Sequence, residues 1–287
     1  MQTFWVIWEK VAELRLWERV AIKSIMFVGV LIVVLYPNPL LLGQQLRAYV
    51  HTESLIQPAF AGMDRINQDI DGYLSPDATR EHEFRMIQRY VYEHIPYVYD
   101  WENWGNIDFW PTAEQVWERR KEDCDGRAIL AVSILRARGF TAATLVGNIR
   151  HIWVEVDQDE LMGPDRERTL SRVDGKTRIN LPSAELLLGS IALHIADFPT
   201  IRNLILLFTI MLLGYHPCKN LTGLFALSTM GLMGFILFKD WARHVMNTRS
   251  IPINFDFIGG CSLLCIALIL SFFMQRIIQQ KCVKRDA

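Results

Sequence analysis

The chain has 287 residues, enough for one compact domain of ordinary size and additional segments. Hydrophobic residues make up 51% of it, which is high for a purely soluble protein, and they concentrate in residues 20–42 and again after residue 198. The formal net charge of −1 gives no support for general attraction to nucleic acid or acidic lipid, so we expect no nucleic-acid partner.

Residues 1–20 predict an amphipathic helix. Apolar side chains recur there at helical spacing, with charged residues between them, and they are Phe4, Trp5, Trp8, Val11 and Leu14. Such a helix lies on the inner membrane surface or packs on another part of the protein, and the pattern allows both.

Residues 21–43 predict a transmembrane anchor. The run Ser24–Leu42 is almost continuously apolar, and roughly 20 such residues span a hydrocarbon core. A cleaved signal peptide is the alternative. About twenty residues precede the run and no A-x-A cleavage site follows it, so we interpret it as an anchor.

Residues 44–190 predict a soluble domain, because apolar residues alternate with charged ones at helical or strand spacing. Phe84, Ile87 and Val91 indicate an amphipathic helix within Asp77–Tyr92. The next stretch, residues 97–111, is irregular and holds six aromatic rings. It is either a folded, partly buried loop or the wall of a substrate cleft.

Thr112 is expected to cap a short helix ending near Arg120, with Gln115 completing a capping box. Cys124 lies at the start of a helix whose periodic part is Ala128–Arg138, and a glycine follows it as a stop signal. The later elements are predicted as strands over Thr141–Val146 and His151–Val156, a turn over Asp157–Glu160, and a third strand from Leu161.

Three further apolar helices are predicted within residues 198–275, followed by a basic tail over 276–287. The runs are Phe198–Tyr215, Leu221–Phe238 and Ile258–Met274. A buried or interfacial helix is the alternative for the first run, which is short. Basic residues cluster before the first anchor and after the last run, so four spans would put both ends in the cytoplasm and the middle domain outside.

The predicted domain contains one cysteine, Cys124. The other cysteines of the chain follow the domain, and they are Cys218, Cys261, Cys265 and Cys282. A solitary thiol is either an inert core residue or a chemically used one. At a helix start, free N–H groups and the helix dipole favour a thiolate and can bind an oxyanion, although Asp123 and Asp125 oppose negative charge. His151, opening a strand that packs on this helix, can reach the sulfur as its base.

The sequence contains no motif that indicates a metal site or a nucleotide site. The motif H-E-x-x-H is absent, the seven histidines lack metal-ligand spacing, and no nucleotide-binding glycine pattern occurs. We therefore expect neither a metal nor a cofactor.

These motifs together resemble a known family. Asp123–Ala128, followed by Leu135–Phe140, resembles the nucleophile helix of transglutaminase-like domains, and His151–Val156 resembles their histidine strand. The approach Asp100–Thr112 is similar to that of bacterial members of the superfamily. The resemblance covers about residues 75–165, roughly a third of the chain.

The resemblance implies an α+β fold with a papain-like core, in which the nucleophile helix packs on an antiparallel sheet. The transmembrane helices, predicted from the apolar runs, lie outside the resemblance. The resemblance also implies a Cys-His-Asp triad in which Cys124 is the nucleophile and His151 the base. Gly163 occupies the position of the usual aspartate, so we predict Asp165 as its substitute. Asp174 or a backbone carbonyl is the alternative.

We therefore predict a membrane-anchored thiol enzyme that acts on peptide or amide bonds through an acyl-enzyme thioester. Protease, deamidase and amide acyltransferase activities all remain open, with the lipid bilayer and a peptide or protein substrate as partners. The alternative is a catalytically inactive transglutaminase-like binding module in a membrane protein.

Overall fold

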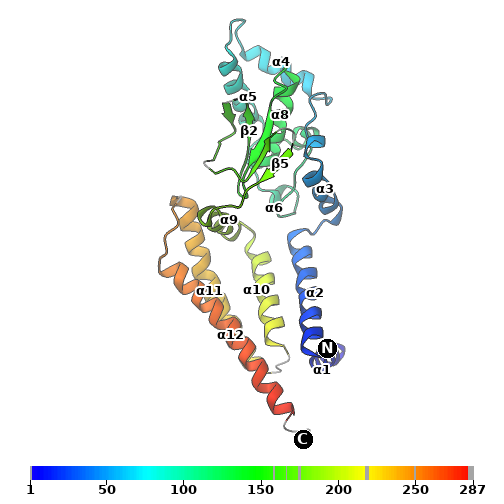
Figure 1. Ribbon diagram of the computed structural model, residues 1–287, viewed down its shortest axis with the longest axis vertical. Helices are drawn as coiled ribbons and strands as arrows, with labels where there is room; N and C mark the ends of the chain where they lie inside the picture. The colour runs from blue at the N-terminus through cyan, green and yellow to red at the C-terminus, as the bar shows by residue number, and fades with distance from the viewer. Residues whose placement is uncertain are drawn as a thin grey trace. The chain divides into compact units, whose positions relative to one another are not determined.

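The computed structural model describes residues 2–157, 159–165, 167–173, 176–216, 220–248 and 250–283. The described chain is mostly helical and contains an antiparallel sheet. It separates into two compact units, one formed by Asn38–Ser190 and the other by Met1–Pro37 with Ile191–Ala287 (Figure 1). The elements are α1 (Gln2–Glu13), α2 (Leu16–Leu35), α3 (Pro39–Val50), a 3-10 helix (Thr52–Leu55), α4 (Met63–Tyr73), α5 (Arg80–His94), α6 (Asp100–Asn103), α7 (Ala113–Arg119), α8 (Cys124–Ala137), β1 (Thr144–Gly147), β2 (Ile152–Val156), β3 (Asp159–Leu161), β4 (Leu170–Val173), β5 (Lys176–Ile179), α9 (Ala184–Ala196), α10 (Thr200–Tyr215), α11 (Leu221–Thr248) and α12 (Phe255–Val283).

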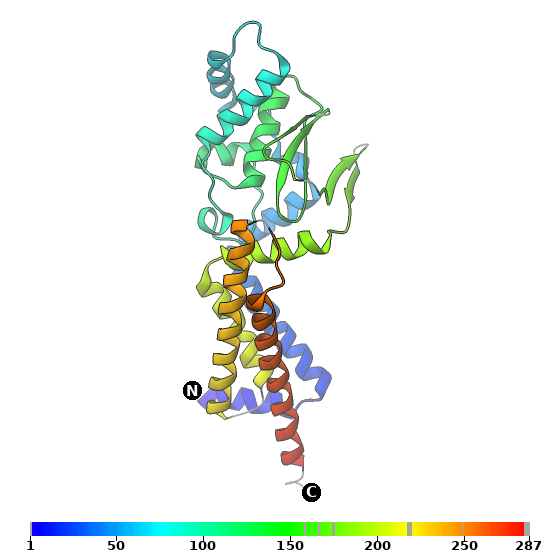
Figure 2. The same cartoon turned by 90° about the vertical axis from the view of Figure 1, so that its left-hand side faces the viewer.

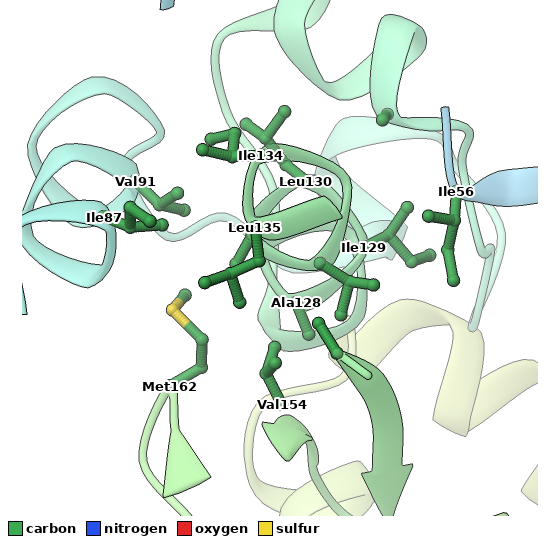
Figure 3. Close-up of a cluster of buried hydrophobic side chains, with 14 of the residues drawn as sticks. Ile56, Ile87, Val91, Ala128, Ile129, Leu130, Ile134, Leu135, Val154 and Met162 are labelled. Atoms are coloured by element: carbon green, nitrogen blue, oxygen red, sulfur yellow. The ribbon is translucent and has the colours of Figure 1, made fainter. Parts of the chain in front are cut away.

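Helix α8 lies at the centre of the core of the unit Asn38–Ser190. Every residue of α8 from Ala128 to Leu135 is buried, so the helix has no polar face and must be covered on all sides. Figure 3 shows Ile87 and Val91 of α5 beside it, with Val154 of β2 and Met162 pointing at it from the side of the sheet. The start of α8 is thereby held against β2.

Local signals explain where the helices of this unit begin. The predicted capping box is confirmed: the Thr112 hydroxyl accepts from the Gln115 N–H, and the Gln115 side chain accepts from the Thr112 N–H. Helix α5 begins after Thr79, whose hydroxyl caps it. Gly139, at φ 91°, ends α8 where a left-handed residue is required.

The sheet has the strand order β3-β2-β1-β4-β5. Strands β1, β2 and β3 pair antiparallel, and the β4–β5 hairpin joins the other edge of β1 where Gly147 faces Leu170. The predicted turn over Asp157–Glu160 was too long: β3 already begins at Asp159. Asp157 has φ 54°, which lets the chain reverse more tightly than a four-residue turn would.

The aromatic stretch over residues 97–111 is a folded, partly buried loop, which is one of the two alternatives considered from the sequence. Trp101 and Phe109 are buried, whereas Tyr97 is exposed. The rings of Tyr99 and Trp101 stack with centroids 4.3 Å apart. The loop carries the short helix α6 and ends on the buried residues that lead into α7.

The other unit is made of helices. Helix α10 contacts α2, α11 and α12, and α11 packs along α12, as Figure 2 also shows. Gly234 and Gly260 lie where these two helices meet: a Cβ at Gly234 would stand 3.0 Å from the Gly260 carbonyl oxygen. Glycine at both positions therefore permits close contact of the two backbones.

Among the described residues, α11 is long and apolar enough to cross a membrane. Two helix pairs with short breaks, α2 with α3 and α9 with α10, satisfy the same criteria when each pair counts as one broken span, which gives up to three candidates. The shorter run Phe255–Ser271 of α12 is apolar as well. Helix α1 exists as predicted, but the side chains of Phe4, Trp5 and Trp8 lie outside the described residues.

The predicted anchor over residues 21–43 is not one continuous helix. Helix α2 ends at Leu35, and α3 begins at Pro39. The Asn38 side chain accepts from the N–H groups of Leu40 and Leu41, so it caps a new helix, and Pro39 at the first helical position suits that start. The prolines thus break the apolar run near its far end.

Candidate active site

Cys124 is the first residue of α8. Asp123 caps the helix, and its carboxylate accepts from the Asp125 N–H at 3.2 Å. The thiol is partly buried. Its sulfur therefore stands at a helix N-terminus, where backbone N–H groups are available to a negative charge.

The backbone N–H of Ile152, the first residue of β2, lies near the Cys124 sulfur and acts to lower the pKa of the thiol. His151 immediately precedes this residue. The structure therefore brings the sulfur against the backbone that joins His151 to β2, although 27 positions separate the two residues in the sequence. Packing of α8 on β2 produces this approach.

The imidazole of His151 is held by a main-chain carbonyl. Its Nε2 lies 3.0 Å from the carbonyl oxygen of Met162, and since a carbonyl only accepts, Nε2 carries the proton. Nδ1 has no hydrogen-bond partner among the described residues. This assignment leaves Nδ1 as the nitrogen that can take a proton from a thiol.

Met162 is itself well anchored. Its N–H donates to Gln88 Oε1 at 2.7 Å, and its side chain is buried against α8 (Figure 3). Met162 and Gly163 both have positive φ, 71° and 75°, so β3 stops at Leu161 and the Met162 carbonyl turns toward the ring. A backbone carbonyl thus occupies the place behind the imidazole.

Asp165, the predicted third triad member, is placed differently. Its carboxylate accepts from the Asn148 side chain at 3.1 Å and pairs with Arg150 at 2.9 Å, whereas the ring Nε2 is directed to Met162. Asn148 Oδ1 in turn accepts the N–H of His151 at 2.9 Å. Asp165 therefore reaches His151 through Asn148, and its catalytic role stays a prediction.

Asp174, the alternative third member, lies outside the described residues. Gly163, at the position of the expected aspartate, is close to the ring: a Cβ built there would be 3.7 Å from His151 Nε2. A side chain at this position would therefore point at the imidazole.

Four carboxyl groups gather beside Cys124, and the sequence pattern did not predict them as a group. Asp100, Glu122, Asp123 and Asp125, here called the acidic cluster, each offer one oxygen within 4.8 Å of the others. All but Asp123 are buried. The visible signal was the acidic run around Cys124, but nothing local linked Asp100 to it.

Burial and mutual repulsion disfavour the charged forms of these groups. Burial, followed by the charge of Asp123, raises the pKa of Glu122 to about 8. Burial likewise raises the pKa of Asp123 to about 6, and the pKa values of Asp100 and Asp125 lie well above the ordinary value. Glu122 therefore keeps its proton at neutral pH.

The pKa of the Cys124 thiol is also raised by burial and by nearby negative charge. Burial, and next the charge of Asp123, raises the pKa of Cys124 well above its ordinary value, while the Ile152 N–H works in the opposite direction. An isolated thiolate is thus disfavoured. A base that takes the proton as the sulfur attacks is needed for reactivity at neutral pH.

Arg127, one turn into α8, borders the site with two tyrosines. Its guanidinium lies 5.1 Å from the ring centroid of Tyr92 and 5.2 Å from that of Tyr97, and its Nε donates to the Ile95 carbonyl. Both tyrosines are exposed. They form a cationic and aromatic surface beside the nucleophile position.

Residues 65–160 match the model of the transglutaminase-like superfamily, as predicted from the motifs. The matched segment runs from α4 to β3 and ends before Gly163 and Asp165. No curated protein and no solved structure matches the chain. The chain therefore carries a transglutaminase-like superfamily domain, whose matched segment includes both Cys124 and His151.

Proposed function

We propose that this domain is a thiol enzyme that acts on peptide or amide bonds, with Cys124 as nucleophile and His151 as base. One observation carries the proposal: the Cys124 sulfur meets the N–H that follows His151, while the His151 ring is oriented through Nε2 and keeps Nδ1 free. The superfamily match, in a superfamily that commonly includes cysteine enzymes, supports the same assignment.

The proposed reaction begins with transfer of the thiol proton to His151 Nδ1 as the sulfur attacks the amide carbonyl carbon. The tetrahedral oxyanion is stabilised by N–H groups at the start of α8, including that of Cys124. His151 then donates the proton to the leaving nitrogen, the carbon–nitrogen bond breaks, and a thioester remains on Cys124. Water or an amine takes the acyl group in the second step.

The Met162 carbonyl takes the orienting role in this proposal. It fixes the ring and its tautomer, but it carries no full negative charge with which to stabilise an imidazolium. We therefore expect a slower enzyme than one with a carboxylate at this position, by up to about four orders of magnitude.

The test is the alkylation rate of Cys124 by iodoacetamide in the full-length protein in detergent, followed on the Cys124 peptide by mass spectrometry. His151→Ala is expected to slow alkylation at pH 7 at least tenfold, in line with the usual size of base catalysis of about a hundredfold or more. His82→Ala, which removes an exposed histidine of α5, is the matched control and leaves the rate unchanged. An activated ester should also leave a hydroxylamine-sensitive acyl group on Cys124.

A second candidate function is a catalytically inactive binding module. The raised pKa of Cys124 and the carbonyl in place of a carboxylate favour it. It predicts that Cys124 reacts no faster than an ordinary solvent thiol, and that His151→Ala changes nothing. That pair of results would remove the enzyme proposal.

We also propose that the chain is a multi-pass membrane protein with this domain on the non-cytoplasmic side. Basic residues before α2 and near the end of the chain support this orientation. In sealed inside-out vesicles, an added protease should leave the domain intact, and it should degrade the domain only after detergent is added. Digestion without detergent would reverse the orientation.

A further inference from the structure

We infer that Arg127, Tyr92 and Tyr97 bind a carboxylate of the substrate beside Cys124, so that the proposed enzyme prefers peptides or amides with an acidic group near the scissile bond. These three side chains are here called the arginine–tyrosine surface. The inference rests on the proposed function in one respect, which is that the bound molecule is a substrate.

Arg127 lies on the same face of α8 as Cys124. The two residues are three positions apart in this helix, and side chains at that spacing are neighbours, with Cβ atoms about 5–6 Å apart. Helical side chains also lean toward the helix N-terminus, which is where Cys124 stands. One extended peptide residue spans about 3.3–3.6 Å. A carboxylate held by Arg127 therefore lies within about two residues of a carbonyl that Cys124 attacks.

The guanidinium of Arg127 is held in place but has no anionic partner. Its Nε donates to the Ile95 carbonyl at 2.8 Å, and the rings of Tyr92 and Tyr97 flank it. Among the described residues, its terminal nitrogens make no hydrogen bond and no ion pair. The side chain is partly buried, and burial lowers its pKa. A partly desolvated guanidinium with open donors suits a carboxylate, which it can bind through two hydrogen bonds.

The two tyrosines add hydroxyl donors to the same surface. Partial burial raises the pKa of both phenols, so each keeps its proton at neutral pH. Their side chains are 39% and 47% exposed, and neither hydroxyl makes a hydrogen bond within the part of the chain that the structure describes. Because a carboxylate only accepts hydrogen bonds, these donors and the guanidinium can bind it together.

Tyr92 also joins the arginine–tyrosine surface to the histidine. A Cβ built at Gly163 would lie 3.8 Å from the Tyr92 hydroxyl oxygen and 3.7 Å from His151 Nε2. The hydroxyl and the imidazole therefore border the same point. A group bound by Tyr92 is close to the atoms that the proposed reaction uses.

Asp123, which precedes Cys124, opposes an anionic substrate. Burial raises the pKa of Asp123 only to about 6, so most of this carboxyl is ionised at pH 7. Arg127 must supply the attraction that exceeds this repulsion. Its removal should therefore turn a preference for anionic molecules into a preference for neutral ones.

Matched alkylating probes measure this preference. N-iodoacetyl-glycine and N-iodoacetyl-glycinamide differ by one charge at the position of a C-terminal carboxylate. The α-amides of N-iodoacetyl-glutamate and N-iodoacetyl-glutamine differ by one charge on a side chain. The labelling rate of each probe is measured at pH 7 on the Cys124 peptide, by mass spectrometry of the full-length protein in detergent.

The anionic member of at least one pair should label Cys124 about threefold faster than its neutral partner or more, because a charge-assisted hydrogen bond is roughly twice as strong as a neutral one. The pair that shows the preference identifies the carboxylate as C-terminal or side-chain. A smaller ratio of anionic to neutral rates in both pairs would overturn the inference. This measurement uses the unaltered protein, so it decides the matter even where a variant does not fold.

Arg127→Gln should lower the ratio to below one, and Arg127→Lys, which keeps the charge, should restore part of it. Tyr92→Phe keeps the ring and removes the hydroxyl, so it should lower the ratio about twofold. Arg85→Gln is the matched control, because Arg85 is an exposed arginine of α5 that pairs with Glu81, and the ratio should not change. An unchanged ratio in Arg127→Gln would contradict the inference.

His151→Ala separates this inference from the proposed function. An imidazolium also attracts anions, so the ratio is measured in this variant as well. Both members of a pair should slow together while their ratio persists; loss of the ratio would assign the preference to His151 and overturn the inference. If His151→Ala changes no rate and no activated ester acylates Cys124, the proposed function fails, while a persistent ratio still supports carboxylate binding by Arg127.

Discussion

Gly163→Asp should increase the reactivity of Cys124. A Cβ at this position would lie 3.7 Å from His151 Nε2. A carboxylate oxygen is about 2.4 Å from its Cβ by standard bond lengths, so it can come within hydrogen-bonding distance of Nε2. The new carboxylate would take over from the Met162 carbonyl as the partner of the ring.

The expected increase in the labelling rate follows from comparing the hydrogen bond that Nε2 makes to the Met162 carbonyl with the one it would make to the new carboxylate. A neutral bond contributes about 0.5–1.5 kcal/mol and one to a charged group about 1.5–3 kcal/mol, so the imidazolium gains about 1–2 kcal/mol. That corresponds to roughly tenfold faster alkylation of Cys124 at pH 7. The φ of 75° at Gly163 opposes the change by about 1 kcal/mol of folding stability, although aspartate tolerates this region better than most residues.

The assay is iodoacetamide labelling of Cys124 in the full-length protein, with far-UV circular dichroism to check folding. Gly163→Asn is the control, since it has the same shape and the same tolerance of positive φ but no charge. Equal rates for the aspartate and asparagine variants would refute the reasoning. So would a folded aspartate variant that labels more slowly than the unaltered protein.

Three further predictions concern the histidine support, the acidic cluster and the helix packing. Asn148→Ala leaves the His151 N–H without its acceptor, so it should cost about 1–3 kcal/mol of stability and slow Cys124 labelling, whereas Asp165→Asn should have a smaller effect. In EGTA, the free energy of unfolding should fall as the pH rises from about 4.5 to 8, because the folded state keeps a proton on Glu122 that the unfolded state loses. Glu122 contributes a slope of at most about 1.4 kcal/mol per pH unit. Glu122→Gln should remove this contribution to the pH dependence. Gly234→Leu should lower the thermal midpoint of the detergent-solubilised protein by weakening the α11–α12 contact, at a cost of about 1–3 kcal/mol.

Opposite results would be equally informative. If Asp165→Asn slows labelling more than Asn148→Ala does, Asp165 acts on the ring directly. A free energy of unfolding that rises over the same pH range would mean that Glu122 is ionised in the folded protein. An unchanged midpoint for Gly234→Leu, with Gly29→Leu as a control at an open position of α2, would place no close contact at Gly234.

Much of the fold of the matched domain was predictable because its signals are local. A hydroxyl three residues before a glutamine marks the start of α7, and a left-handed glycine marks the end of α8. The periodicity of α5 and the alternation of β2 also depend on near neighbours. The turn before β3 was misplaced by two residues, because the tight turn depends on a positive φ at Asp157 that the sequence pattern does not specify.

The candidate site was predictable only in part. The motifs around Cys124 and His151 led to the superfamily, and the match over residues 65–160 agrees with them. The partner of the imidazole was left open between carboxylates and a carbonyl. The choice depends on two consecutive left-handed residues, Met162 and Gly163, whose conformation the sequence pattern does not specify.

By itself, the sequence determined that this chain joins apolar helices to a transglutaminase-like domain with one cysteine at a helix start and one histidine at a strand start. Periodicity, capping and motif order are properties of neighbouring residues, so they can be seen without a structure. Only the tertiary structure decided that the Met162 carbonyl holds the ring and that Asp100 joins the carboxyl groups around Cys124. The first depends on the left-handed conformation of Met162 and Gly163 at the end of β3. The second depends on pairing of Tyr97 with Glu122, which are far apart in the sequence, and such pairing is fixed by packing of the whole domain.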